Sequence, residues 1–221
     1  MSDPLSFPAV QDYLAGLVPP RPPEMQAMER YADEHDFPII GPVAGYQCYQ
    51  IARMIGAQRV FEMGSGYGYS TAWFARAVTE TCAGQGQHDG CGVVHHTVWD
   101  AALSQMAAGH LSRMGFDGLV EYHVAEAVET LTSTPGPFDL IFNDINKEAY
   151  PASLPIIKDK LRPGGVLIVD NMLWSGRIFD PSDRSGATTG VREFTRRITA
   201  DPDWIVTLSP VRDGMIIAYK K

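Results

Sequence analysis

The sequence predicts an α/β fold with a largely parallel β-sheet and helices on both of its faces. From Arg59 onward, short runs rich in β-branched and aromatic residues alternate with longer runs of helical periodicity. This alternation is typical of parallel sheets whose crossover connections are helices. Near the C-terminal end, two further apolar runs are separated only by a short turn around Arg212, Asp213 and Gly214. This spacing predicts an antiparallel hairpin added to the parallel sheet.

The individual elements follow from the residue patterns in chain order. Before residue 58, apolar and small residues recur every three to four positions and prolines interrupt the pattern, so two or three helices are expected there. The predicted strands are RVFEM, GVVHHTVW, LVEYHV, FDLIFN, GGVLIVD, WIVTLSP and GMIIAYK. The predicted helices of the second part are STAWFARAV, AALSQMAAGHLSRMG, AEAVETL, YPASLPIIKDKL and VREFTRRITA. The polar, glycine-rich segments 79–92 and 179–190 are predicted to be loops.

Length and composition favour one domain over the whole chain. The 221 residues are 45% hydrophobic and 20% charged, which is enough for one substantial core. We therefore expect residues 1–221 to form a single domain, with helices in 1–57 that cover the functional site and an α/β core in 58–221.

Charge and cysteine usage argue against several classes of protein. The formal net charge of −8 argues against a broad basic face for a nucleic acid. The start of the chain lacks a basic and then apolar leader pattern, and no run of about 18 apolar residues occurs, so a cytoplasmic protein without a membrane span is expected. Cys48, Cys82 and Cys91 are odd in number and lack CxxC spacing, and are interpreted as ordinary thiols.

A glycine-rich turn follows the first predicted strand. Gly64, Gly66 and Gly68 lie between RVFEM and the next helix, after the acidic residue Glu62 near the strand end. Glycines at such a turn let the backbone approach a ligand closely, and the helix N-terminus offers unpaired N–H groups. A dinucleotide fingerprint requires a further glycine where this chain has Tyr69, so an NAD-dependent dehydrogenase is the weakest alternative. A tight turn that binds nothing stays open as an alternative.

Polar side chains end two of the predicted core strands. Asp144 follows FDLIFN, and Asp170 with Asn171 follows the next strand. Because the carboxyl ends of parallel strands meet at one edge of a sheet, two carboxylates and one amide oxygen are expected there together. Such hard oxygen ligands suit Mg²⁺, or alternatively Mn²⁺ or Ca²⁺, and two buried carboxylates without a cation would repel each other. The alternative that these acids are separate capping or solvated residues stays open.

Three segments together resemble a known family. FDLIFNDINKEAY, LRPGGVLIVDNMLWSGRI and PVRDGMIIAYKK resemble the cation-dependent O-methyltransferases of the caffeoyl-CoA and catechol O-methyltransferase type. The resemblance extends from about Ile40 to the C-terminus. It implies a Rossmann-like S-adenosylmethionine (SAM) methyltransferase fold, with a mostly parallel seven-stranded sheet, a C-terminal antiparallel hairpin and extra N-terminal helices. It also implies a homodimer.

The resemblance assigns roles to residues of the two strand ends. It implies that Asp144, Asp170 and Asn171 hold one divalent metal ion and that Lys147, with Asp144, is catalytic, Lys147 serving as the base for the acceptor hydroxyl. An amine accepts a proton only in its neutral form, which partial burial and a nearby metal ion favour. The family's second acidic residue in this motif is Asn146 here, which leaves the metal trio intact but makes the site less negative.

The resemblance also implies a binding site for the SAM cofactor. The glycine turn and the following helix would contact the methionine portion, the segment after LVEYHV would contact the adenine, and the helix start GPVAGYQ would close over the cofactor. The implied cofactor-binding residues are Val43, Glu62, Gly64, Ser65, Gly66, Ser70, Thr97, Ala127 and Asp144.

One expected residue is missing from that cofactor site. The strand GVVHHTVW should carry an acid near its end for the two ribose hydroxyls, but Thr97 occupies the position. A neutral hydroxyl makes one such bond, so either cofactor affinity is weaker or Asp100 substitutes. Trp99 is interpreted equally as an adenine-stacking residue or as a core residue. His95 and His96 are assigned to the strand and not to a metal site.

These observations predict a metal-dependent enzyme that transfers a methyl group from SAM to a hydroxyl of a small vicinal dihydroxy aromatic substrate. One alternative keeps the fold and metal but methylates a hydroxylated tRNA base, which the acidic balance disfavours. The other is a SAM-binding protein without transfer activity. The substitution at Thr97 favours this alternative. The retained residues argue against it: Asp144, Lys147, Asp170 and Asn171.

Overall fold

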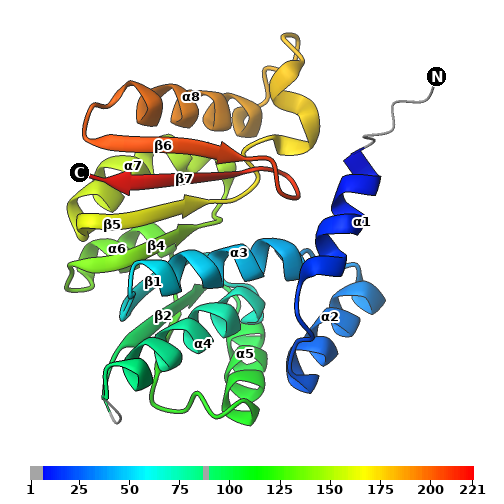
Figure 1. The fold of residues 1–221 in the computed structure, drawn as a ribbon. Helices are drawn as coiled ribbons and strands as arrows, with labels where there is room; N and C mark the ends of the chain where they lie inside the picture. Colours follow the sequence, from blue (N-terminus) through cyan, green and yellow to red (C-terminus); the bar gives the residue numbers. More distant parts are fainter. Residues whose placement is uncertain (1–6, 87–89) are drawn as a thin grey trace.

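The structure is a computed structural model that describes residues 7–86 and 90–221, and its centre is a seven-stranded mixed β-sheet (Figure 1). The strand order across the sheet is β3-β2-β1-β4-β5-β7-β6. The strands are β1 (Arg59–Met63), β2 (Val93–Val98), β3 (Val120–Val124), β4 (Phe138–Asn143), β5 (Leu161–Val169), β6 (Trp204–Ser209) and β7 (Met215–Lys220).

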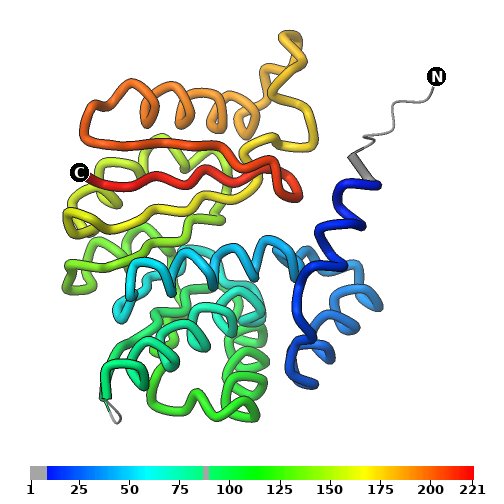
Figure 2. The backbone as a smooth tube through the Cα atoms, viewed as in Figure 1, coloured from blue at the N-terminus to red at the C-terminus, as the bar shows by residue number. Residues whose placement is uncertain are grey.

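The pairing confirms the predicted parallel sheet with an antiparallel addition. Strands β1 to β5 are parallel to their neighbours, and β7 is antiparallel to both β5 and β6. In Figure 2 the red β7 lies between the yellow β5 and the orange-red β6. The chain builds outward from β1 to β3 and then returns to place β4 on the other side of β1. The gap between the carboxyl ends of β1 and β4 is therefore a topological switch point, where α/β proteins bind ligands.

Helices cover both faces of the sheet, as predicted. One apolar layer joins α2 to α5 to the sheet and includes Phe74 and Val94, and the other joins α6 to α8 to the opposite face and includes Phe61 and Phe194. Successive strand residues point to opposite faces, so one strand supplies both layers. The helices are α1 (Phe7–Leu17), α2 (Pro23–His35), α3 (Gly41–Met54), α4 (Tyr69–Gly84), α5 (Ala101–Arg113), α6 (Ala127–Ser133), α7 (Tyr150–Lys160) and α8 (Gly186–Ala200), with 3₁₀ turns η1 (Lys147–Ala149) and η2 (Trp174–Phe179).

The expected N-terminal helices are present, as α1, α2 and α3. Figure 1 shows α1 and α2 beyond the arrowheads of the parallel strands, which is the carboxyl edge of the sheet. Within residues 7–86 and 90–221, no helix has both the length and the apolar character needed to cross a membrane.

Both predicted loops are shorter than expected. Helix α4 continues to Gly84, because Thr81 and Cys82 are buried against the core and extend its apolar face. Residues 79–84 are therefore helical, and part of the remaining loop, 87–89, lies outside the described residues. Helix α8 begins at Gly186, where the hydroxyl of Ser185 caps the helix by accepting the Thr188 N–H at 3.4 Å.

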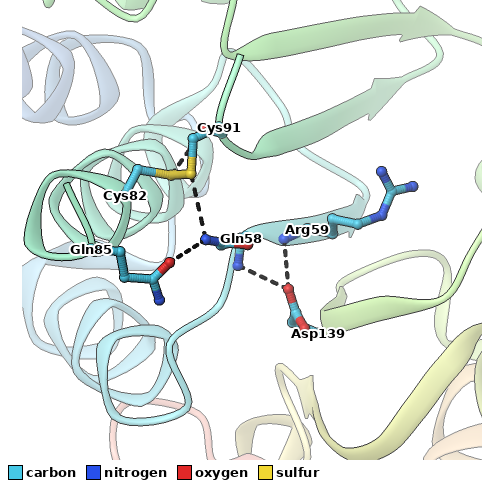
Figure 3. The surroundings of a disulfide bond; sticks show 6 residues. All are labelled: Gln58, Arg59, Cys82, Gln85, Cys91 and Asp139. Atoms are coloured by element: carbon cyan, nitrogen blue, oxygen red, sulfur yellow. Dashed lines mark hydrogen bonds between the residues drawn. A yellow bond between two sulfur atoms is a disulfide. The ribbon is translucent and has the colours of Figure 1, made fainter. Parts of the chain in front are cut away.

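Two of the three cysteines form a disulfide, so the expectation of three ordinary thiols is wrong. Cys82 lies near the end of α4 and Cys91 just before β2, with their Cα atoms 5.9 Å apart, a separation that a disulfide can bridge. The pairing depends on how the helix end meets the strand start, which a spacing rule does not capture. Figure 3 shows Gln58 beside the bridge, with Nε2 at 2.6 Å from Oε1 of Gln85 and 3.4 Å from Sγ of Cys91. Cys48 is a buried free thiol.

The disulfide lies at the amino edge of the sheet. Gln58 directly precedes β1, and the Asp139 carboxylate accepts the backbone N–H groups of Gln58 and Arg59 at 2.9 and 2.8 Å (Figure 3). This end of the sheet is opposite the carboxyl ends of the parallel strands.

Candidate active site at the carboxyl edge of the sheet

The two acidic strand ends are neighbours in the sheet. Met63, Asn143 and Val169 form one row across β1, β4 and β5, so Asp144 and Asp170 each follow directly after that row. The backbone N–H of Asp144 donates to the Met63 carbonyl at 2.8 Å, and that of Asp170 donates to the Asn143 carbonyl at 3.1 Å. The predicted convergence of these acids at one sheet edge is therefore present in the backbone.

The glycine turn brings the chain after β1 against the chain after β4. Gly64 has a φ of +86°, and a Cβ atom built on it would lie 2.5 Å from the carbonyl oxygen of Asp144. Only glycine tolerates both the backbone conformation and this contact. Gly68, with a φ of +91°, is the N-cap of α4, whose first N–H groups lie at the same edge of the sheet.

A cavity of about 420 Å³ opens at this edge. Its lining brings together the glycine turn, the ends of β2, β4 and β5, the segment before α3 and the turn before β7. A smaller cavity of about 40 Å³ shares four of these residues, Pro38, Ile39, Gly64 and Asp144, and reaches Ser65, Gly66 and Ser70. The lining of the larger cavity is Pro38, Ile39, Gly64, Thr97, Trp99, Ala127, Asp144, Ile145, Asn146, Lys147, Glu148, Asn171, Trp174, Ala187 and Arg212.

Asp170 is a fully buried carboxylate with one free oxygen. Its exposed fraction is 0%, its Oδ2 accepts from Nη1 of Arg212 at 2.9 Å, and its Oδ1 has no hydrogen-bond partner. Burial, followed by repulsion from Asp144, raises the pKa of Asp170 to about 6, against the opposing effect of Arg212. The site therefore contains a buried carboxylate oxygen without a hydrogen-bond donor, and two carboxylates whose negative charges repel each other. A further cation would reduce this repulsion.

Asp144 is paired with the predicted base. Nζ of Lys147 lies 2.6 Å from Oδ1 of Asp144 and 3.2 Å from the Ile145 carbonyl, and the Lys147 side chain is 10% exposed. Burial raises the pKa of the Asp144 carboxyl, and Lys147 and then Arg212 oppose that shift. The ammonium also lies over the rings of Tyr150 and Trp174, at 5.2 and 5.7 Å from their centroids.

Asn171, directly after Asp170 at the end of β5, has a left-handed backbone conformation. Its φ is +58°, which asparagine tolerates better than most residues. Its Nδ2 donates to Oδ2 of Asp213 at 3.4 Å, while Oδ1 of Asp213 accepts the Ser175 N–H at 2.6 Å. Asn171 lines the same cavity as Asp144, and its amide oxygen is chemically able to bind a cation. Two carboxylates, one of which has the unpartnered Oδ1 of Asp170, and an amide oxygen suit a hard divalent cation.

Glu62 lies beneath the glycine turn, behind the cavity wall. Its side chain is 0% exposed, and its Oε2 accepts from the hydroxyl of Thr71, while Oε1 has no partner. Burial raises the pKa of Glu62 to about 7, although the nearby hydroxyls of Ser70, Thr71 and Ser65 act in the opposite direction.

The end of β2 is joined to the glycine turn through Thr97. The Thr97 N–H donates to Oγ of Ser65 and the Ser65 N–H donates to the Thr97 carbonyl, both at 3.0 Å. Oγ1 of Thr97 is buried without a partner at the cavity wall. Trp99 is 69% exposed and lines the cavity, so its interpretation as a core residue is wrong. Asp100 caps α5, because its Oδ1 accepts the Ala102 N–H at 2.7 Å and the Leu103 N–H at 3.1 Å.

Most of the residues predicted from the sequence meet at this edge, but not all line the cavities. Gly64, Thr97, Ala127, Asp144, Lys147 and Asn171 line the larger cavity, and Ser65, Gly66 and Ser70 line the smaller one. Val43, Glu62 and Asp170 line neither of these two: Glu62 and Asp170 lie buried beneath, and Val43 lies within α3.

The structure also adds residues that the sequence did not indicate. Pro38 and Ile39 line both cavities from the segment before α3, Ala187 contributes from α8, and Arg212 reaches in from the turn before β7. The turn 212–214 was recognised only as a hairpin connection. An arginine at a turn gives no local signal that its side chain reaches a carboxylate 42 positions earlier.

Comparisons with known proteins identify the family of this chain. A model of the O-methyltransferase family matches residues 41–221. The catechol O-methyltransferase of Mycobacterium tuberculosis is 32% identical over 84% of this chain and 81% of its own length. The catechol O-methyltransferase of Niastella koreensis is 26% identical over 97% of this chain and 98% of its own.

Two solved structures are similar over nearly the whole chain. The O-methyltransferase TomG from Streptomyces achromogenes, solved in complex with SAM, has a TM-score of 0.83 and 27% identity, covering 96% of each chain. The O-methyltransferase from Bacillus cereus, solved in complex with SAH, has a TM-score of 0.82 and 26% identity, covering 96% of this chain and 97% of its own. The chain belongs to the O-methyltransferase family. The predicted methyltransferase fold and enzyme class are confirmed.

Proposed function

We propose that this O-methyltransferase transfers the methyl group of SAM to a hydroxyl of a small vicinal dihydroxy aromatic substrate, with the help of one divalent cation. The observation that carries the proposal is the meeting of Asp144, Asp170 and Asn171 at adjacent strand ends, beside Lys147 and a cavity of about 420 Å³. The catechol O-methyltransferase relatives support the substrate class.

The proposed metal ligands are oxygen atoms of Asp144, Asp170 and Asn171. This donor set favours Mg²⁺, with Mn²⁺ or Ca²⁺ as alternatives, over metals that prefer nitrogen or sulfur. The raised pKa values of both aspartates and the unpartnered Oδ1 of Asp170 support a cation there. A divalent cation, when bound, supplies Lewis acidity that favours ionisation of an acceptor hydroxyl beside it.

The proposed SAM site is the glycine turn and the cavity wall around it. Gly64, Ser65, Gly66 and Ser70 would face the methionine portion, and the solved relatives that contain SAM or SAH support this cofactor. Ala127 and the exposed Trp99 would face the adenine, and the buried hydroxyl of Thr97 would donate to or accept from a ribose hydroxyl. Glu62 lies beneath the glycine turn and would support it. Val43 lines neither cavity and would contribute only through its place in α3, the helix that follows the cavity wall at Pro38 and Ile39.

Lys147 is the proposed base. A phenolic hydroxyl with a pKa of about 10 costs about 4 kcal/mol to ionise at pH 7. Nζ of Lys147 lies at the cavity wall next to Asp144, where it can take that proton in its neutral form. Trp174 of η2 and Ala187 of α8 line the cavity and would exclude water from the oxygen and the sulfonium while they react.

The chain is further proposed to act as one methyltransferase domain. Residues 1–57 would contribute to the cover of the site, which Pro38 and Ile39 at the cavity wall support. The homodimer, the cytoplasmic location and the absence of a nucleic acid partner stay predictions.

A methyl-transfer assay tests the proposal. Purified protein, SAM and a panel of catechols, flavonoids and hydroxycinnamoyl esters are incubated with Mg²⁺ and then with EDTA, and methylated products are measured by mass spectrometry. We expect Mg²⁺-dependent methylation of at least one vicinal diol and none of the matching monohydroxy compounds.

Paired variants locate the activity at the proposed site. Asp144→Asn and Asp170→Asn should abolish turnover while a native circular dichroism spectrum is retained, and Asp159→Asn, an exposed acid on α7, is the control. Undiminished turnover in either site variant, or equal turnover in EDTA, would refute the metal-assisted mechanism. SAM binding by calorimetry without any transfer would instead favour a binding protein.

A further inference from the structure

A second group of potential metal ligands lies on the outer strands of the sheet, separate from the aspartates of the proposed active site. His95 on β2 pairs in register with Glu121 on the edge strand β3, and His123 follows two residues later on the same face of β3. One ligand atom from each of the three side chains lies within 4.8 Å of the others. The sequence assigned His95 to its strand, because nothing local shows that two further ligands lie beside it.

The distances between these atoms match those around a small divalent ion. Nδ1 of His95 lies 3.0 Å from Nε2 of His123 and 3.3 Å from Oε2 of Glu121. A tetrahedral zinc site with bonds of about 2.0 to 2.1 Å has ligand atoms separated by about 3.3 Å. The two separations from His95 are therefore close to those between ligand atoms of a tetrahedral zinc site, and the third ligand pair, His123 and Glu121, also lies within 4.8 Å.

The histidine rings are held in place by other aromatic side chains. His95 is 3% exposed and stacks on Phe61 at 5.5 Å and on His123 at 5.3 Å, with the edge of Phe138 at 5.4 Å. A ring held this way loses little freedom on binding an ion. Glu121, with a side chain that is 62% exposed, gives the site an opening to solvent.

The protonation of the rings also suits metal binding. Burial lowers the pKa of His95 to about 4 and lowers the pKa of His123, so both imidazoles are neutral at pH 7 and have a lone pair to offer. In the His95–His123 contact one nitrogen carries a hydrogen that the other accepts. An ion between them requires that hydrogen on the other nitrogen of its ring, a tautomer change that leaves the rings in place.

We propose that His95, Glu121 and His123 form a binding site for a divalent transition metal of the zinc class, distinct from the oxygen-lined site of Asp144 and Asp170. Two imidazole nitrogens and one carboxylate oxygen are a ligand set that zinc uses with a water as fourth ligand. Imidazole ligands also separate this site from one that prefers Mg²⁺. The bound ion would tie the edge strand β3 to β2.

Calorimetric titration tests the site. Protein without a histidine tag is stripped with EDTA, dialysed and titrated with Zn²⁺ in buffer that contains excess Mg²⁺, so that a site of hard oxygens does not contribute. Wild-type protein should bind one Zn²⁺ per chain, and its Tm should rise on adding Zn²⁺ because the ion binds only the folded state. Glu121→Gln and His123→Asn should each weaken binding at least about 10-fold, since loss of a direct ligand costs no less than loss of its supporting contacts.

Two control variants distinguish this site from exposed histidines and from the proposed active site. His35→Asn removes an exposed histidine of α2, and Asp170→Asn removes an acid of the proposed active site; both should retain the Zn²⁺ affinity of the wild type. Glu121 is exposed, so Glu121→Gln is expected to fold. This variant therefore tests the site even if His123→Asn fails to fold. Failure of the wild type to bind Zn²⁺, or wild-type affinity in Glu121→Gln, would overturn the proposal. Loss of binding in Asp170→Asn would overturn it in favour of a single shared site.

Discussion

Nη1 of Arg212 lies 2.9 Å from Oδ2 of Asp170, a carboxylate with no exposed surface. Arg212 comes from the turn between β6 and β7, where its φ of +54° directs the backbone back toward the end of β5. The guanidinium balances one buried negative charge at the place proposed for a divalent cation. Arg212 and the cation therefore act on the same carboxylate, and removing one should increase the dependence on the other.

Arg212→Met should destabilise the protein more in EDTA than in Mg²⁺. Without the guanidinium and without a cation, the buried Asp170 is unpaired, and the free energy of unfolding should fall by about 2 kcal/mol, less than for a fully buried pair because Arg212 is partly exposed. Urea denaturation in both buffers measures the difference. Arg184→Met, at an exposed position, is the control, and an equal loss in both buffers would contradict a shared role at Asp170.

Lys147→Met and Lys147→Arg should both lose turnover. A general base contributes about 10²- to 10⁴-fold to a rate, and arginine keeps the charge but cannot be deprotonated. Steady-state kinetics with a catechol substrate measures the loss, and calorimetry should show unchanged SAM affinity. Lys158→Met, which removes a surface ion pair with Asp201, is the control. Substantial activity in Lys147→Arg would show that the residue acts through its charge.

Thr97→Val should weaken SAM binding without destabilising the protein. Oγ1 of Thr97 has no partner within the protein, so its removal breaks no internal hydrogen bond. If it bonds the ribose, the loss is about 1 kcal/mol, or about fivefold in Kd. Thr81→Val removes another buried, unpartnered hydroxyl far along α4 and should leave the Kd unchanged. Equal SAM affinities of wild type and Thr97→Val would remove Thr97 from the cofactor site.

Glu62→Gln should flatten the dependence of stability on pH. The pKa of Glu62 is raised to about 7 in the folded state, above its value of about 4.3 in an unfolded chain. The folded state therefore holds the proton more tightly, and this contribution is complete below about pH 4 and lost as the pH rises through 7. Between pH 5 and 8 the wild type should lose about 2 to 3 kcal/mol more than Glu62→Gln.

Denaturation series across that pH range, in EDTA, provide the measurement for Glu62. Asp144 and Asp170 titrate in the same direction but are present in both proteins, so the difference isolates Glu62. The exposed Glu34→Gln serves as control, and parallel pH curves for wild type and Glu62→Gln would show that Glu62 is ionised throughout.

Gly64→Ala should disrupt the site, whereas Gly84→Ala should not. At Gly64 a methyl group meets the Asp144 carbonyl at 2.5 Å and the φ is +86°, so the cost should be at least about 1 to 3 kcal/mol. At Gly84, in the last turn of α4, no atom lies within 4 Å, and alanine should be neutral or stabilising. Thermal unfolding and SAM affinity report both effects; a Gly64→Ala protein with wild-type Tm and Kd would show that the turn can move away from Asp144.

The sequence by itself determined the sheet and the backbone of the site. Strands and helices follow from apolar periodicity, and a parallel sheet then forces the ends of β4 and β5 together, which brings Asp144 to Asp170. Gly64 was recognisable for the same reason, because a glycine between a strand and a helix marks a close backbone approach. These relationships depend on local pattern and on one topological rule.

Tertiary structure alone decided which distant side chains share a space. Arg212 reaches Asp170, Cys82 joins Cys91, and His95 meets His123, and none of these contacts has a signal in the residues around it. Local pattern reports which face of an element is apolar, but a polar side chain can find its partner on any element that packing brings near. The strand register and the path of the turns, both set by burial of the whole core, therefore fix these pairs.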